Sequence, residues 1–271
     1  MKKLMAILLV LTMVFAMAAC GGEGDTQTTT TAATTEATTE GTTEGTTEAT
    51  DVLTTMTHDE FLAAEDFSAV CVEVYVQNTQ SWWNDKITVY AQDDNGGYFI
   101  YNMTCSEEDA AKLVPGTKIK VTGYKRVYNG LHEIDAGATF TFVEDAEPMV
   151  YENKDVTELL GTDGLEAYQS AAVSFKGMTV EAKTNAAGEE VAFLYGWDGS
   201  GEAGTDSDLY FDASINGQTY TFVIEYYLCD ENSAPYQAVQ NLKVGDVIDM
   251  EGFLYWYQGP QAHITSITVA E

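Results

Sequence analysis

Alternating apolar and polar residues predict that most of the chain after residue 57 is β-structure. Val70, Val72, Val74 and Val76 alternate with more polar neighbours. A period of two places every second side chain on one face of a strand. This segment is therefore expected to be a strand with one buried face. The same reasoning predicts four further strands, over 86–92, 97–103, 117–124 and 131–142.

Short helices are expected to interrupt and precede the strands. Ser106 and Asp109 form a capping-box-like pattern at the start of one helix, and a similar pattern begins at Thr57. Another short capped helix is expected over 155–160. The order predicted for the first half is three strands, a helix and two strands.

An internal repeat divides the folded part of the chain. Residues 113–130 and 242–259 match at a constant offset, from a turn glycine into a strand and a hairpin. The dipeptides Asn95-Gly96 and Asn216-Gly217 are both expected to form type I′ hairpin turns. The two halves are therefore interpreted as copies of one domain.

The second copy follows the same order with one addition. Its strands are expected over 171–182, 246–253 and 262–269, and its helix over 233–241. An insertion around 184–207 holds an extra apolar run, 191–195. We thus expect one domain over 57–146 and a second over 147–271.

The N-terminal segment carries targeting signals. Lys2 and Lys3 precede an apolar run, 4–16, that is too short to span a membrane and suits a signal peptide over 1–19. Residues 20–56 are rich in Thr and Glu and have too little apolar surface to fold, so they are expected to form a disordered tether.

Charge narrows the choice of partners. The formal net charge is −31, and Arg126 is the only arginine. A polyanion repels phosphate backbones and anionic lipid headgroups. This reasoning makes nucleic acid a poor candidate partner.

Two resemblances extend this interpretation. Met17-Ala18-Ala19-Cys20-Gly21 resembles the lipobox of bacterial lipoproteins, although the family favours Leu where Met17 stands. The strand order resembles the OB-fold, a five-stranded Greek-key barrel. With Ser81-Trp82-Trp83 and the repeated glycine block, the whole chain resembles tandem OB-like surface lipoproteins of Gram-positive gut bacteria, many of which have no assigned activity.

These resemblances imply a location and a fold. Cys20 would carry the lipid and hold the protein on the extracellular face of the cell membrane. The fold class would be mainly β, with two tandem OB-like barrels, each with a short helix, after the tether. OB-folds bind oligonucleotides, oligosaccharides or proteins on strands two and three and in the adjoining loops.

The remaining cysteines are Cys71, Cys105 and Cys229. An odd number argues against a disulfide framework. Small buried residues are the favoured interpretation, and a Cys71–Cys105 bridge is the alternative.

Exposed aromatic residues are the candidate ligand contacts. Each could instead pack in a barrel or between the barrels. The candidates are Trp82, Trp83, Tyr124, Tyr128, Tyr255, Trp256 and Tyr257.

Charged clusters supply two weaker candidates. Four bases gather at Lys118, Lys120, Lys125 and Arg126, where a solvated strand face is favoured over an anion site. An acidic loop is a weak calcium candidate that fails the EF-hand pattern. Its oxygen donors are Asp198, Ser200, Glu202, Asp206 and Asp208.

The sequence therefore favours a binding function. No catalytic motif appears in its required context, and only three histidines could act as a base. The leading hypothesis is a non-catalytic, lipid-anchored module that needs no cofactor and binds a cell-surface protein or glycan. A structural spacer or accessory subunit of a membrane complex is the alternative, and a hydrolase is the least favoured.

Overall fold

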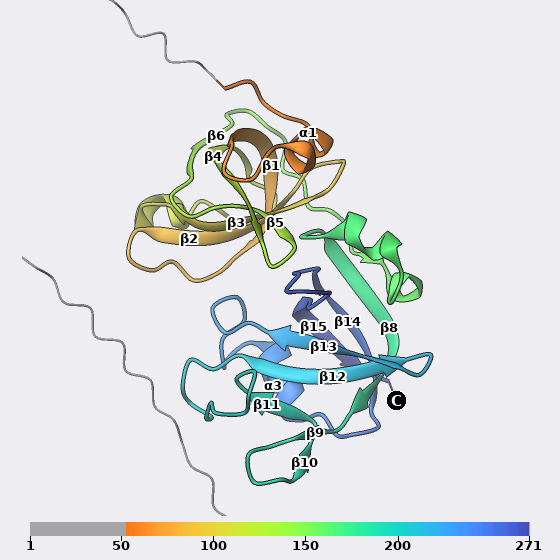
Figure 1. Ribbon diagram of the computed structural model, residues 1–271. Helices are drawn as coiled ribbons and strands as arrows, with labels where there is room; N and C mark the ends of the chain where they lie inside the picture. Colours follow the sequence, from red (N-terminus) through yellow and green to blue (C-terminus); the bar gives the residue numbers. More distant parts are fainter. Residues whose placement is uncertain (1–52, 271) are drawn as a thin grey trace, which may run out of the picture. The chain divides into compact units, whose positions relative to one another are not determined.

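The computed structural model describes residues 53–270, which are mainly β with a few short helices (Figure 1). The signal peptide, Cys20 and nearly all of the expected tether lie outside these residues. Within the described part of the chain, no helix is long and apolar enough to cross a membrane.

Barrel 1 contains strands β1 to β5. Its sheet follows the order β1-β2-β3-β5-β4-β6, and an additional β1–β4 pairing closes it into a five-stranded barrel. The strands of this sheet are β1 (Ala69–Thr79), β2 (Lys86–Gln92), β3 (Gly97–Thr104), β4 (Lys118–Tyr128), β5 (Leu131–Ile134) and β6 (Thr139–Phe142). Helix α2 (Glu107–Ala110) stands between β3 and β4.

Helix α1 (His58–Ala63) packs against barrel 1. Thr57 and Glu60 form a complete capping box at its start, and Phe61 is buried in the barrel core. The backbone N–H of Met56 already donates to the Cys71 carbonyl at 2.7 Å.

Barrel 2 repeats this arrangement with β8 (Ala172–Glu181), β12 (Leu209–Ile215), β13 (Gln218–Ile224), β14 (Val247–Phe253) and β15 (His263–Val269). A β12–β8 pairing closes it. Helix α3 (Ala234–Gln240) lies between the third and fourth strands. The expected pair of OB-like barrels is confirmed.

Additional short elements precede and extend barrel 2. They are β7 (Lys154–Asp155), the 3-10 helices η1 (Thr157–Leu159) and η2 (Asp163–Tyr168), and the strands β9 (Lys183–Thr184), β10 (Glu190–Val191) and β11 (Phe193–Tyr195). β11 pairs with β12, so part of the inserted segment extends the sheet.

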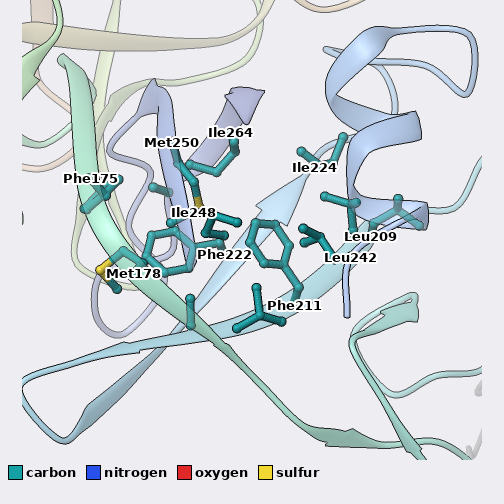
Figure 2. Packing of buried hydrophobic residues seen from close by; sticks show 14 of the residues in the cluster. Phe175, Met178, Leu209, Phe211, Phe222, Ile224, Leu242, Ile248, Met250 and Ile264 are labelled. Atoms are coloured by element: carbon teal, nitrogen blue, oxygen red, sulfur yellow. The ribbon is translucent and has the colours of Figure 1, made fainter. Parts of the chain in front are cut away.

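The interior of barrel 2 is filled by side chains that alternate along its strands. Phe175, Phe211 and Phe222 point toward one another, with Ile248 and Met250 beside them (Figure 2). All five are at most 2% exposed. This period-two burial is the reason the strand pattern could be read from the sequence.

Three details differ from the sequence prediction. The strand expected over 131–142 is split into β5 and β6 by a turn in which Gly137 has a φ of +87°. The helix expected over 155–160 is a single 3-10 turn, η1, because the backbone leaves the helical region at Leu160, where ψ is 128°.

The third difference is the Asn95-Gly96 turn, which is not type I′ because neither residue has a positive φ. Asp93 Oδ1 instead accepts from the N–H groups of both residues. A side chain at Gly96 would lie 2.2 Å from the His58 ring, so close packing explains this glycine. In the second copy, Asn216 and Gly217 do have positive φ values, as a type I′ turn requires.

Candidate functional site: a cleft between the two barrels

A cleft of about 1130 Å³ lies where the two barrels meet. Barrel 1 lines it with the β1–β2 loop, β2, β3, the end of β4, and β5. Barrel 2 lines it with β12, the segments after β13 and β14, and β15. In barrel 1 this is the face of the second and third strands, β2 and β3, where OB-folds take their ligands, whereas the wall from barrel 2 consists mainly of loops.

Aromatic rings dominate the cleft wall. Tyr255 stacks on the His263 ring, with centroids 4.2 Å apart and an interplanar angle of 18°. Trp83 and Trp197 are 70% and 76% exposed, so their ring faces are open. The aromatic residues that line the cleft are Trp83, Phe99, Tyr101, Tyr128, Trp197, Tyr210, Tyr227, Tyr255, Tyr257 and His263.

Direct contacts hold the two walls together. The Tyr90 hydroxyl lies 2.6 Å from His263 Nδ1, and its ring stacks on Phe253 at 4.6 Å. The N–H of Ser81 donates to the Tyr227 carbonyl at 2.6 Å. Aromatic packing and hydrogen bonds therefore join the two walls beside the cleft.

The charged groups in the cleft are mostly acidic, with Lys86 and Arg126 as the two bases. Burial raises the pKa of Glu133 to about 7, with a further contribution from Asp135. Burial also raises the pKa of Glu225 to about 7, assisted by the nearby Asp208. Near neutral pH these carboxyl groups are partly protonated, so the cleft is less negative than a count of acids suggests.

The two adjacent tryptophans separate in the structure. Trp82 packs against the core of barrel 1, and its Nε1 donates to the Cys105 carbonyl at 2.8 Å. Trp83 projects into the cleft. Two neighbouring residues in an extended loop face opposite ways, which places one in the core and one at the site.

The other predicted aromatic candidates fall into two groups, inside and outside the cleft. Tyr128, Tyr255 and Tyr257 line the cleft. Tyr124 is exposed but lies outside it. Trp256 lines a separate, smaller pocket of about 340 Å³ on barrel 2.

The four clustered bases do not form one solvated face. Lys118 and Lys120 both pair with Glu73 at 3.6 Å. Lys125 is 2% exposed and donates to the carbonyls of Leu62 and Ala64. Its burial corrects the sequence interpretation, because the carbonyl groups at the end of α1 take the place of water around the ammonium group.

Arg126 lies apart from the other three bases and reaches the cleft. It pairs with Asp135 at 3.8 Å, a long and partly exposed contact. Of the four clustered bases, this is the one that lines the cleft.

The acidic loop does not assemble a metal site. Among residues 53–270, no group of three or more His, Cys, Asp or Glu side chains is placed to hold a metal ion. Hydrogen bonding by the Ser200 side chain, and by its N–H to Asp198 Oδ1, lowers the pKa of Asp198. Asp208 Oδ1 accepts from the N–H of Tyr226, and both Asp206 and Asp208 line the cleft. Ser200 and Glu202 lie outside the cleft lining.

The three described cysteines are buried and free. Cys71 and Cys105 form no bridge with each other. The favoured interpretation from the sequence, small buried residues, agrees with this arrangement.

Sequence reasoning missed the polar residues of the cleft floor. Glu133 and His263 occupy strand positions that alternation assigns to a buried face, and Glu225 follows directly after β13. A charged residue at a buried strand position was the available signal for Glu133. That signal could be assigned to a binding cleft only once the structure had shown barrel 2 covering this face of barrel 1.

No protein-family model and no curated protein matches the chain. Solved structures of similar fold include the Ifi202 HINa domain in complex with 20-base-pair double-stranded DNA. It is 13% identical, with a TM-score of 0.33, over 75% of this chain and 98% of that one. The p202 HIN1 domain in complex with 12-mer double-stranded DNA is 11% identical, with a TM-score of 0.34, over 76% and 95%. A replication protein A heterotrimer bound to single-stranded DNA is 8% identical, with a TM-score of 0.26, over 81% and 70%.

These complexes correct two expectations from the sequence: a surface protein or glycan as the ligand, and nucleic acid as a poor candidate. With TM-scores of 0.26 to 0.34, they indicate nothing about individual residues of this chain. The charge argument used the net charge of the whole chain, which does not describe the charge of any one surface. Five acidic and two basic side chains line the cleft, and burial raises the pKa of two of the acids, Glu133 and Glu225, to about 7.

Proposed function

We propose that this protein binds unpaired nucleic acid in the cleft between its barrels, without a chemical step. The observation that carries the proposal is the position of the cleft. In barrel 1 it lies on the face of β2 and β3, through which OB-folds bind oligonucleotides, and loops of barrel 2 form the opposite wall. Its aromatic lining supports stacking with bases, which is worth roughly 1–3 kcal/mol per base.

Unpaired bases are favoured over a duplex because of the exposed rings. Trp83 and Tyr101 present open ring surfaces, at 70% and 42% exposure. Only bases outside a duplex offer both faces for stacking. The contacts are expected to tolerate many sequences.

Phosphate contacts contribute less than stacking. Lys86 and Arg126 are the two basic side chains in the cleft lining. Neutralising two phosphates corresponds to a slope of about −1.4 for log affinity against log salt with a single strand. Binding is therefore expected to weaken only modestly with added salt.

Fluorescence anisotropy with a labelled, mixed-sequence single-stranded DNA 12-mer tests the proposal. Trp83→Ala is expected to weaken binding by about tenfold, because one stacking surface is lost. Tyr124→Ala is the matched control, since Tyr124 is exposed outside the cleft. A duplex of the same sequence should bind more weakly.

Three results would count against the proposal. They are no saturable binding of the single strand, equal losses in the two variants, or a salt slope far steeper than two phosphate contacts allow. The last would place binding on a basic surface outside the cleft.

We also propose that Cys20 is lipidated and holds the protein on the extracellular face of a bacterial cell membrane. The lipobox-like residues Met17 to Gly21, after an apolar segment, support this. Cys20→Ala should release the protein from the membrane fraction, whereas Cys229→Ala should not. Retention of the Cys20 variant on membranes would refute the anchor.

A further inference from the structure

We propose that Glu133 of barrel 1 and His263 of barrel 2 form a pair that reads one nucleobase. The Glu133 carboxyl group accepts a hydrogen bond from the edge of the base, and His263 Nε2 donates one to it. This inference rests on the proposed function and assigns two residues to recognition within the same cleft.

Glu133 is largely buried, and its carboxyl oxygens are open to the cleft. It is 5% exposed, lines the cleft, and makes no side-chain hydrogen bond or ion pair in the described part of the chain. Arg126 stands opposite it in the β4–β5 register but pairs with Asp135 instead. These accessible Glu133 oxygens can therefore accept a hydrogen bond from a donor on a ligand.

His263 presents a hydrogen-bond donor to the cleft. The Tyr90 hydroxyl receives a hydrogen bond from Gln80 Nε2 and is therefore free to donate its own hydrogen to His263 Nδ1. Burial lowers the pKa of His263 to about 3, so the ring is neutral. A neutral ring whose Nδ1 accepts carries its hydrogen on Nε2. In the described residues Nε2 has no hydrogen-bond partner, and His263 is 7% exposed and lines the cleft.

The two side chains occupy equivalent places in the two barrels. Glu133 on β5 is the parallel partner of Phe99 on β3, and His263 on β15 is the parallel partner of Val223 on β13. Tyr255 connects them. It stacks on the His263 ring, contacts the Phe99 ring at 5.3 Å, and has its pKa raised by burial and by the charge of Glu133.

This chemistry matches the edge of a base and not the sugar-phosphate backbone. The Watson–Crick edge of every common base places a hydrogen-bond donor beside an acceptor. Such an edge would satisfy Glu133 and His263 together while the ring stacks on the aromatic wall. An abasic strand offers phosphate acceptors but no donor for Glu133. The pair should therefore matter only when bases are present.

The test compares two ligands by anisotropy: the mixed-sequence single-stranded 12-mer and an abasic strand of the same length. Glu133→Leu and His263→Phe should each weaken binding of the 12-mer by about tenfold and leave the abasic strand unaffected. Glu133→Gln keeps a side-chain oxygen acceptor and should lose less than about threefold. Glu133→Leu should remain folded, because the Glu133 side chain makes no hydrogen bond in the described residues that the change would break.

The outcomes separate the two proposals. If the wild type binds and Trp83→Ala weakens binding, but both pair variants bind normally, the pair is refuted and the cleft remains the site. Equal losses for the 12-mer and the abasic strand also refute the pair, because they would show that Glu133 and His263 do not contact a base. If the wild type binds no oligonucleotide, both proposals fail.

Discussion

Lys125 and His263 show how a single side chain acquires its role from burial. Lys125 belongs to the only basic cluster of the folded part, yet its ammonium group is enclosed by carbonyl oxygens at the end of α1 and lies 5.7 Å from the Phe61 ring centre. His263 stands on an ordinary strand, yet Tyr90 and Tyr255 orient its ring at the junction of the barrels. Neither environment is visible from neighbouring residues in the sequence.

The buried His263 predicts a dependence of stability on pH. Its folded pKa of about 3 lies below the ordinary value of 6.5, so protonation favours the unfolded chain. Stability is complete above pH 6.5 and decreases as the pH falls below it. The loss by pH 5 amounts to about 2 kcal/mol. The measurement is urea unfolding of the wild type and of His263→Phe between pH 8 and 5.

The comparison with the variant is necessary because two acids act in the opposite direction. Glu133 and Glu225 have pKa values raised to about 7, so their protonation favours the folded state as the pH falls from 7. These contributions are common to both proteins. The stability advantage of the wild type over His263→Phe should shrink toward pH 5, and parallel pH profiles would contradict the assignment.

At the scale of elements, α1 closes one end of barrel 1 and depends on its first turn. Thr57 Oγ1 accepts from the N–H of Glu60, and the Glu60 carboxylate accepts from the N–H of Thr57. The hydrogen bonds from the Thr57 N–H and hydroxyl to this carboxylate lower the pKa of Glu60. The helix in turn places Phe61 in the core and offers carbonyl groups to Lys125.

Thr57→Ala should therefore destabilise the protein by about 1 kcal/mol, because one side of the capping box is lost. Urea unfolding at pH 7 measures this change. Thr55→Ala is the control, since the Thr55 hydroxyl makes only an exposed 3.4 Å contact with Glu73. A loss of equal size in the two variants would show that the cap contributes nothing specific.

At the scale of the molecule, the two barrels are joined by close backbone packing as well as by aromatic rings. A Cβ placed on Gly97 of β3 would lie 2.2 Å from the backbone N of Ala171, just before β8. The Gln92 side chain accepts from the N–H of Ala172 at 3.0 Å on the same edge. No side chain larger than hydrogen fits at Gly97 unless the barrels move apart.

Gly97→Ala is expected to destabilise the protein by about 1–3 kcal/mol, the usual range for overpacking. It should also weaken oligonucleotide binding, because the cleft needs both walls. Gly164→Ala is the matched control, as its nearest neighbour would be at 3.5 Å. Thermal unfolding and anisotropy provide the two measurements, and wild-type values for Gly97→Ala would show that the barrels are not held by this contact.

The sequence by itself determined the elements that repeat with a period. The strands of both barrels, the helix between strands three and four, and the internal duplication follow from alternation and turn residues, because these patterns are local. Breaks within a strand, such as the turn between β5 and β6, were missed because a short interruption leaves the alternation nearly intact.

Only the tertiary structure decided which residues form the site. Trp82 and Trp83 are adjacent residues of the same type, and the sequence gives no reason to separate them. In the structure Trp82 packs against the core of barrel 1 and Trp83 lines the cleft. Glu133 and His263 are 130 positions apart, and the meeting of the two barrels places them on one surface. Contacts between residues far apart in the sequence set the burial, the pKa values and the hydrogen-bonding direction of these groups. Neighbouring residues in the sequence therefore cannot predict these properties.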